Sequence, residues 1–501
     1  MEIESSRPAL FEINTRAYLN ELGIKLNKKA TLDDIPDSLL LDLANKGFDF
    51  VWLLGVWQIG DTGRDISRSN QSWQQSFRDC LCDLSQKDIS GSPFAIQSYK
   101  VDSILGGDDS LARLRNRMTG FNLKICLDFV PNHTAIDNPW VDSNPDFYVR
   151  GTEKDIENQP ENYIKIKSKN GDQVFAHGRD PYFPGWPDTL QLNYFNSKFQ
   201  QEMSSVLNKI ASQCDALRCD MAMLVLSSVF KKTWGERSSF GNNDYSVKEF
   251  WPAAIQAVKS AIPGFIFIAE AYWDLEFELQ QQGFDYTYDK RLYDRLCHEN
   301  PDSIIPHLRA DWEYNKKLVR FLENHDEERA AKVFSPEKQC AAALVTFFAP
   351  GLLFFHEGQI EGWKIHASIH LNRRPKEEKS DYLTSFYSKL LIALKNPEIK
   401  TSAYQVLNAR QAFENDQSFR QFICALRIGS NGNISLAISN YGPSKAQCFL
   451  PLPVPNIKNK TVILKDELGP NKYDREGNKL TSEGLYLDMP AWGCHLFKII
   501  I

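Results

Sequence analysis

The chain has 501 residues and a formal net charge of −6, and 42% hydrophobic with 24% charged residues is a composition typical of a folded protein. This acidic balance provides no basic field for nucleic acid, and no apolar run is long enough to span a membrane. We therefore expect neither nucleic acid nor a membrane as a partner. The length predicts two or three domains, of which a large barrel would count as one.

The N-terminal sequence indicates the cellular location, and the cysteine pattern indicates the state of the thiols. The sequence begins MEIESSRPALFEI, with two glutamates where a signal peptide carries positive charge, and we expect a cytoplasmic protein. The ten cysteines form no CxxC pair, and several lie in apolar runs, such as Cys126 in LKICLDFV. We expect reduced, buried thiols rather than disulfides or a zinc site.

Short apolar runs alternate with longer amphipathic stretches, which is typical of repeated β-α units around a parallel sheet. The eight expected strands are residues 9–13, 48–54, 123–130, 216–219, 265–269, 284–288, 318–322 and 351–355. The segments between them, such as the helical-looking 110–118 and 199–213, are long enough to cross back over a sheet. Eight such units predict an α/β protein with a (β/α)₈ barrel.

Two further parts are expected. From His133 to about Leu190 the chain is rich in Asn, Pro, Asp and aromatic residues, which predicts a small inserted domain, residues 134–189, after the third strand. Beyond about residue 400, short strand-like pieces with turn signals predict a C-terminal antiparallel β-sandwich domain, residues 399–501. The barrel then comprises residues 1–133 and 190–398.

Polar residues follow several of the expected strands, at the ends where active sites of such barrels lie. They are Asp128, Asn132 and His133 after the third strand, Arg218 and Asp220 after the fourth, Glu270 after the fifth, and His325 and Asp326 after the seventh. Each of them alone is more often a cap or a turn residue. Their conjunction in four separate units predicts a functional site.

The sequence around these residues resembles glycoside hydrolase family 13, the α-amylase family, from about residue 9 to residue 500. The four main signatures of that family are matched in order. The similar segments are LDFVPNH (127–133), LRCDMAM (217–223), FIAEAYW (267–273) and FLENHDEER (321–329), together with QLNYFN (191–196) and APGLLFFHEGQ (349–359).

This resemblance implies an α-retaining enzyme in which Asp220 is the nucleophile, Glu270 the general acid/base and Asp326 the supporting carboxylate. Such cleavage needs one carboxylate to attack the anomeric carbon and a second, protonated carboxyl to protonate the leaving oxygen. Arg218 lies two residues before Asp220, so on a strand both point to the same face, and its charge would keep Asp220 ionised and oriented. A structural salt bridge is the alternative for Arg218.

The resemblance also implies sugar contacts. His133 and His325 would hold hydroxyls of the sugar that is cleaved, and Asp128 would support the site from behind. Phe94 and Tyr99 lie where the family has an aromatic residue that stacks on this sugar, with core packing as the alternative. In the stretch 177–189, the aromatic residues Tyr182, Phe183 and Trp186 either line the cleft or form the core of the inserted domain.

The sequence departs from the family pattern at the part of the site that contacts the leaving or accepting sugar, and at the calcium site. Met223 and Leu224 replace a Lys-His pair that contacts the sugar on the leaving side. Gln191 stands where a calcium-binding aspartate is usual, while Asn132 matches the other family ligand. Because calcium prefers charged oxygen ligands, we expect no metal at this place and no required cofactor. The stretch 371–379 is expected at the surface, or else Arg373 and Arg374 bind an anionic substrate.

Three functions remain open. The first is hydrolysis of α-glucosidic bonds in glucans, maltooligosaccharides or small α-glucosides, with a carbohydrate as the only expected partner. The second is transfer of the same glycosyl intermediate to a sugar or phosphate acceptor, because the acceptor side departs from the family. The third is an inactive binding subunit, which the presence of all three carboxylates disfavours. The sequence does not fix linkage, endo or exo action, or oligomeric state.

Overall fold

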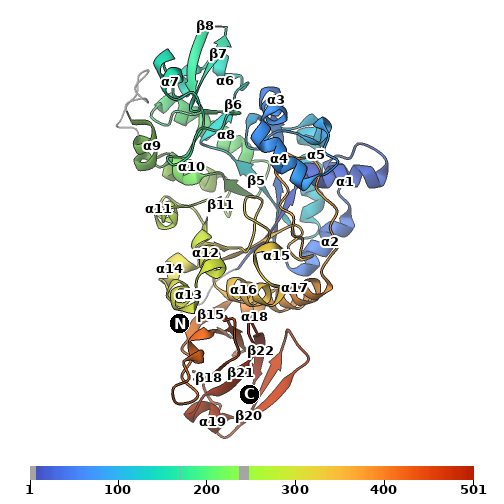
Figure 1. Cartoon of the computed structure of the whole chain (residues 1–501), viewed down its shortest axis with the longest axis vertical. Coiled ribbons are helices and arrows are strands. Elements are labelled where there is room, and N and C mark those ends of the chain that lie inside the picture. The colour runs from blue at the N-terminus through green and yellow to red at the C-terminus, as the bar shows by residue number, and fades with distance from the viewer. Residues whose placement is uncertain (1–6, 170, 236–247, 431) are drawn as a thin grey trace.

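The computed structural model describes residues 7–169, 171–235, 248–430 and 432–501. The molecule is elongated, with a barrel in the middle, an insertion at one end and a β domain at the other (Figure 1). The first six residues, on which the expectation about a signal peptide partly rests, lie outside the described residues.

Eight parallel strands form a closed barrel in the order β1-β14-β13-β12-β11-β10-β5-β2. They are β1 (Ala9–Asn14), β2 (Phe50–Leu54), β5 (Lys124–Phe129), β10 (Ala216–Cys219), β11 (Ile266–Ala269), β12 (Tyr286–Tyr288), β13 (Leu318–Arg320) and β14 (Leu352–His356). Each coincides with an expected strand. The predicted (β/α)₈ barrel is therefore confirmed.

The barrel strands are nearly continuous apolar runs because both of their faces are buried. All five residues of β2 and all five of β14 are buried. Alternate side chains, among them Leu10, Trp52, Cys126 and Phe354, form one core cluster, and their sequence neighbours belong to a second, larger cluster. The inside of the barrel is thus a packed core, which leaves only the strand ends for chemistry.

Helices follow most of the barrel strands. They are α1 (Thr15–Leu26), α2 (Asp37–Lys46), α5 (Gly107–Thr119), α8 (Ser197–Ala211), α9 (Ser227–Trp234), α10 (Phe250–Ala261), α11 (Glu276–Gln281), α12 (Lys290–His298), α13 (Pro301–Leu308), α14 (Trp312–Asn315), α15 (Ala330–Val333), α16 (Pro336–Phe348), α17 (Asp381–Leu394) and α18 (Pro397–Lys400). The expected helices at 110–118 and 199–213 correspond to α5 and α8. Asn196 caps α8 by accepting hydrogen bonds from two backbone N–H groups.

The connection between β2 and β5 is larger than the sequence indicated. It contains β3 (Trp57–Ile59), α3 (Asp61–Ser69), α4 (Gln71–Cys80) and β4 (Ile96–Val101) ahead of α5. The strands β3 and β4 form an antiparallel pair, and the two short helices lie on the side of the barrel where the inserted segment also lies (Figure 1). This connection therefore contributes to the walls of the site.

The inserted segment after β5 is built from two small antiparallel pairs. Its elements are β6 (His133–Ala135), α6 (Trp140–Ser143), α7 (Glu153–Asn158), β7 (Tyr163–Ser168), β8 (Gly171–Ala176) and β9 (Thr189–Gln191). In the pair of β6 with β9, His133 is the partner of Gln191. Both ends of the segment are thereby fixed at the rim of the barrel.

The C-terminal domain is an antiparallel two-layer β structure, as predicted. A six-stranded sheet of order β15-β16-β17-β22-β19-β20 faces the two-stranded sheet β18-β21 across one apolar core. The elements are β15 (Ser402–Leu407), β16 (Phe422–Gly429), β17 (Ile434–Asn440), β18 (Ala446–Leu450), β19 (Thr461–Asp466), β20 (Lys472–Glu476), α19 (Gly477–Ser482), β21 (Leu485–Met489) and β22 (Cys494–Ile500).

Buried polar groups join this domain to the barrel below α16 and α17 (Figure 1). The hydroxyl of Tyr441 donates to the carbonyl of Leu296 at 2.6 Å, and Nε of Arg427 donates to the carbonyl of Phe348 at 2.9 Å. Buried donors of this kind need partners with fixed geometry, so the two parts pack as one body.

All ten cysteines are free thiols, and seven of them are buried. Cys82 is exposed, and Cys297 and Cys494 are partly buried, so the expectation of buried thiols is wrong for Cys82. Among the described helices, none has the length and the apolar character that a membrane crossing requires.

Gly351 provides a test of barrel packing. Its φ is +107°, and a Cβ atom there would lie 2.1 Å from the carbonyl oxygen of Leu318. We expect Gly351→Ala to lower the free energy of unfolding by about 3 kcal/mol or more, measured by urea denaturation. The control is Gly264→Ala, at φ +83° with no atom near the added Cβ, which should cost only about 1 to 2 kcal/mol of backbone strain. Equal losses in the two variants would contradict this packing.

Candidate active site

A cavity of about 320 Å³ opens at the carboxyl ends of the barrel strands. Asp220 follows β10, Glu270 follows β11 and Asp326 follows β13, and all three line this cavity. The other lining residues are Trp73, Ser92, Phe94, His133, Trp186, Asp188, Thr189, Met221, Tyr272, Ile369 and His370. The structure thus brings the three predicted carboxylates together.

Arg218 connects two of these carboxylates from below. Its Nη1 donates to Oδ1 of Asp220 at 2.6 Å, and its Nη2 lies 2.8 Å from Oε2 of Glu270. The side chain of Arg218 is only 1% exposed. Since a buried guanidinium needs compensating charge and its fork has fixed geometry, one residue holds both carboxylates at a set spacing.

Glu270 has the surroundings of a proton donor. Burial, together with the charges of Asp220 and Asp326, raises the pKa of Glu270 to about 7, although Arg218 opposes this change. The backbone N–H of Met221 donates to its Oε2 at 2.6 Å, and the hydroxyl of Tyr272 donates to its Oε1 at 3.0 Å. Met221 reaches this position with a φ of +41°, a strained conformation for a long side chain.

Asp326 and His325 form a charged group with Glu12, a residue that the sequence did not single out. Nδ1 of His325 lies 2.5 Å from Oε1 of Glu12, and its Nε2 lies 3.1 Å from Oδ2 of Asp326. Burial lowers the pKa of His325, but the two carboxylates outweigh burial and raise that pKa well above its usual range. His325 is therefore an imidazolium held between Glu12, which is fully buried, and Asp326.

The same imidazolium affects Asp326. Desolvation at the cavity raises the pKa of Asp326, but the charge of His325 outweighs this and lowers the pKa to about 2. The Asp326 side chain is 44% exposed, so this carboxylate faces the cavity. Glu12 lies on β1, where a run of apolar residues gave no signal for a functional group.

Two of the predicted residues lie beneath the cavity rather than in its wall. Asp128 accepts hydrogen bonds from Nε1 of Trp52 and from the backbone N–H of Gly55, each at 3.0 Å. The hydroxyl of Tyr99 donates to the carbonyl of Val130 and accepts from its N–H. Asp128 thus supports the site from behind, and Tyr99 packs in the core.

Phe94 and His133 line the cavity, as expected for sugar contacts. The ring of Phe94 lies 5.4 Å from that of His325 and 5.1 Å from the Arg218 guanidinium carbon. The ring of His133 lies 5.0 Å from that of Trp186. Of the three aromatic residues predicted in the inserted segment, only Trp186 lines this cavity.

The other two are exposed, by 59% at Tyr182 and 67% at Phe183, and form no core. The ring of Tyr182 lies 5.0 Å from that of Trp273, and Nζ of Lys232 lies 5.5 Å from the same tyrosine ring. Trp273 is the sequence neighbour of Tyr272. An exposed aromatic pair therefore stands beside the Glu270 side of the cavity.

Three further lining residues were not predicted: Trp73 and His370 come from segments without a recognisable signal, and Asp188 lies within the predicted stretch 177–189. Trp73 on α4 contacts the ring of His370 at 4.7 Å between centroids, and Nδ1 of His370 lies 2.9 Å from the hydroxyl of Ser67. Burial lowers the pKa of His370 to about 4, so its ring is neutral. Burial also raises the pKa of Asp188 to about 6, and its Oδ2 has no hydrogen-bond partner among the described residues.

Where the family resemblance would place a calcium ion, the structure has the side-chain amide of Gln191. Nε2 of the fully buried Gln191 donates to the backbone carbonyl and to Oδ1 of Asn132, both at 3.0 Å, and to the carbonyl of Leu192 at 3.1 Å. The three oxygens thus converge on an amide nitrogen, and none of them is a carboxylate, whereas calcium sites usually include carboxylate oxygens. Within the described residues, no group of three or more His, Cys, Asp or Glu could hold a metal ion.

Both arginines of the stretch 371–379 are paired. Arg373 contacts Asp83 and Asp88, while Arg374 contacts Glu21 and Glu357. Neither lines the cavity. Their charges are paired with carboxylates, at the surface for Arg373 and in a buried position for Arg374, so their position does not support recognition of an anionic substrate.

The comparisons with known proteins agree with this geometry. The family described as "Alpha amylase, catalytic domain" matches residues 92–421. The chain belongs to the α-amylase family of glycoside hydrolases and transferases.

Its similarity to individual relatives is lower. "Alpha-amylase 3" of Dictyoglomus thermophilum is 22% identical over 299 residues, 54% of each chain. "Alpha-1,4-glucan:maltose-1-phosphate maltosyltransferase" of Bifidobacterium longum is 33% identical over 131 residues, 25% of this chain and 16% of that protein. The chain therefore spans about half, or less, of the length of these curated relatives.

A noncanonic maltogenic alpha-amylase from Thermotoga neapolitana has a structure similar to this chain. It superposes with a TM-score of 0.70 at 19% identity, covering 99% of both chains. At that identity the likeness extends to the fold alone.

The Gln191 geometry yields a prediction about metal removal. We expect EDTA to leave the melting temperature of the wild type unchanged, because the side-chain NH2 group of Gln191 already donates to these oxygens. In Gln191→Asp, the new carboxylate would face only oxygen atoms, which repel it, and the melting temperature should fall. Added calcium should bind these oxygens and restore the melting temperature. A fall in the wild-type melting temperature on chelation would contradict the interpretation.

Proposed function

We propose that the protein is a retaining α-glycosidase acting on α-glucosidic bonds of maltooligosaccharides, α-glucans or small α-glucosides. The observation that carries this proposal is the Arg218 bridge between Asp220 and Glu270. Retention requires two carboxyl groups about 5 Å apart, one as nucleophile and one as acid, and one guanidinium that contacts both keeps them close.

In the proposed reaction, Asp220 attacks the anomeric carbon while Glu270 gives its proton to the leaving oxygen, which forms a covalent β-glycosyl intermediate. Glu270, now a carboxylate, then takes a proton from water as that water attacks the same carbon, and Asp220 leaves. A pKa of about 7 suits Glu270 to both steps, because it can be protonated first and ionised later.

The donor sugar would lie between Phe94, His133 and Asp326. Phe94 offers a ring for the apolar face of the sugar, and the His325 imidazolium would stabilise Asp326 as it binds sugar hydroxyls. The unpartnered Oδ2 of Asp188 is a further acceptor for a hydroxyl in the same cavity. A neutral carbohydrate matches these groups, and we propose it as the substrate class.

A second candidate is transfer of the same intermediate to another sugar. The exposed pair of Tyr182 and Trp273 beside Glu270 favours it, because aromatic faces on the leaving side can hold an acceptor in place of water. The inactive-subunit alternative has no support from the geometry, since all three carboxylates line one cavity.

The remaining expectations are also proposals. We propose that no cofactor is needed, with the Gln191 amide in place of a calcium ion. The ten free thiols support a reducing compartment such as the cytoplasm.

Two variants test the roles of the carboxylates. We expect Asp220→Asn to lower kcat by about 10⁴-fold on every substrate. Glu270→Gln should lose comparable activity on maltooligosaccharides, but it should still be glycosylated by α-glucosyl fluoride, because fluoride leaves without a proton. Mass spectrometry of Glu270→Gln after incubation with the fluoride should show an added glucosyl group. Full activity of Asp220→Asn would rule out the mechanism.

The pH dependence tests the acid. Since Glu270 must be protonated in the free enzyme, kcat/KM should fall as the pH rises through about 7. Tyr272→Phe removes a hydrogen bond to the carboxylate form, so the pKa and the alkaline limb should move up by as much as about one pH unit. Tyr182→Phe is the control, with an unchanged limb expected. A downward shift in Tyr272→Phe would contradict the assignment.

Product analysis separates the two candidate functions. The enzyme is incubated with maltooligosaccharides, disaccharides and α-glucosyl phosphate, with and without added maltose. Free glucose or maltose alone indicates hydrolysis, whereas oligosaccharides longer than the substrate indicate transfer. If transfer occurs, Trp273→Ala should reduce the ratio of transfer to hydrolysis.

A further inference from the structure

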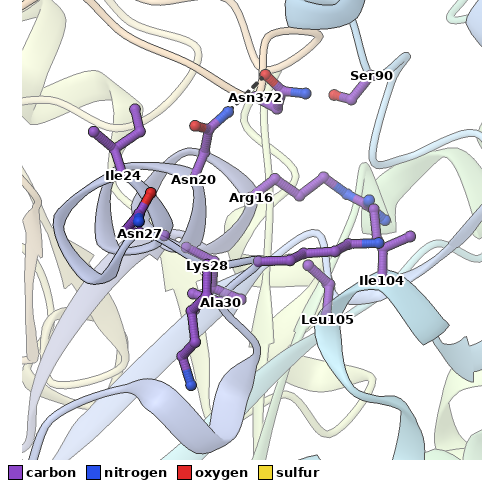
Figure 2. Close-up of a pocket in the computed structure, with 13 residues that line it drawn as sticks. Arg16, Asn20, Ile24, Asn27, Lys28, Ala30, Ser90, Ile104, Leu105 and Asn372 are labelled. Carbon is purple, nitrogen blue, oxygen red and sulfur yellow. Dashed lines mark hydrogen bonds between the residues drawn. The ribbon is translucent and has the colours of Figure 1, made fainter.

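A second cavity, of about 620 Å³, lies outside the catalytic one beside helix α1 (Figure 2). Helix α1 contributes Arg16, Leu19, Asn20, Gly23 and Ile24, whose spacing of three and four residues places them on one face, and its C-cap residue Asn27 follows. In Figure 2, Ile104 and Leu105 stand across from this face, and Asn20 donates to Asn372 at 3.1 Å. The size is within the range of small-molecule sites.

The lining is cationic although the protein is acidic. Arg16, Lys28 and Lys29 line the cavity, and within the described residues no aspartate or glutamate does. Arg16 is paired with Asp102 behind the lining, and Lys28 is paired with Asp34. The Lys28 side chain is 54% exposed and can turn to a ligand, and Lys29 makes no ion pair in the described part of the chain. An anionic group is the electrostatic complement.

The rest of the lining suits a small hydroxylated molecule. Asn20, Asn27, Asn372 and Ser90 bring amide and hydroxyl groups that can both donate and accept hydrogen bonds. Leu19 and Leu105 are buried, whereas Ile24 and Ile104 are 69% and 41% exposed. Apolar walls with several convergent polar groups are typical of ligand sites, and they can accept the apolar face of a sugar ring.

We propose that this cavity binds a phosphorylated monosaccharide, with Lys28 and Lys29 at the phosphate and the amides of Asn20 and Asn372 at the sugar hydroxyls. Lysine serves as a mobile point charge for phosphate, and a hexose monophosphate is small enough for the volume. This ligand is distinct from the neutral substrate proposed for the catalytic cavity.

The two cavities share a wall. Residues 89 and 371 form an antiparallel bridge, and the N–H of Ser90 donates to the carbonyl of His370 at 2.8 Å. Ser90 and Asn372 line the outer cavity, while Ser92 and His370 line the catalytic one. A ligand bound to Asn372 therefore contacts the same segment that contains His370. Its binding should change the KM for substrate.

Isothermal titration calorimetry of the full chain with glucose 6-phosphate at low ionic strength tests the proposal. We expect saturable binding that glucose does not reproduce. The double variant Lys28→Gln/Lys29→Gln removes positive charge at the phosphate, and the separate variant Ile104→Glu adds a negative charge that opposes it. Each should weaken binding at least about tenfold. The controls are Lys25→Gln, in the last turn of α1 but outside the lining, and Ile392→Glu, exposed on α17; both should bind like the wild type.

Several results would overturn the proposal. They are no binding to the wild type, equal binding to the wild type and to both cavity variants, or displacement of glucose 6-phosphate by maltose, which would place the ligand in the catalytic cavity. Inorganic phosphate binding as tightly as glucose 6-phosphate would overturn the assignment of a sugar. For an oligosaccharide substrate, saturating glucose 6-phosphate should change KM in the wild type but not in Ile104→Glu. An unchanged wild-type KM would overturn the coupling between the cavities.

The calorimetry needs no turnover, so its outcome is independent of the proposed function.

Discussion

The site depends on one buried positive charge. Arg218 lies at the end of β10 with its fork between Asp220 and Glu270, and burial there would be costly without both carboxylates. The carboxylates in turn need a cation, since three acids lie around one small cavity. The barrel provides this balance at the strand ends, where the chain leaves the packed interior and polar groups can face a cavity.

The opposite pKa shifts of Glu270 and Asp326 arise from their neighbours. Glu270 is buried beside two other carboxylates and holds its proton up to about pH 7, whereas Asp326 lies beside a charged imidazole and is ionised far below that. Two carboxyl groups of similar chemistry thus have pKa values on opposite sides of their usual range because of burial and one histidine. The strained backbone of Met221 adds a directed N–H group to the same arrangement.

The sequence predicted the barrel well because its strands are buried on both faces and are visible as apolar runs. The rim residues were found because they follow these runs in recognisable motifs. Glu12 was missed, since one acid in a strand of apolar residues resembles a surface position. Trp73 and His370 were missed for another reason: they reach the cavity through long connections, and only tertiary packing shows where such segments lie.

The motifs could be recognised from the sequence, but the position of each of their residues relative to the cavity could not. Asp128 and Tyr99 both belong to the predicted set, yet their polar atoms are taken by Trp52, Gly55 and Val130 beneath the cavity. Spacing along a strand tells which residues share a face. It does not tell how deep each one lies, because depth depends on the tilt of the strands and on the loops that close above them.

The contact between Glu12 and His325 joins the first strand of the barrel to the loop after the seventh, across 313 residues. Glu12 is on the strand that pairs with both β2 and β14, so its carboxylate reaches His325 when the last strand has taken its place beside the first. The position of the His325 imidazole therefore depends on closure of the barrel, because β1 holds Glu12 in place through its pairing with both neighbouring strands. A substitution that loosens the seam between β1 and β14 would thus disturb the charges at the rim without touching a rim residue.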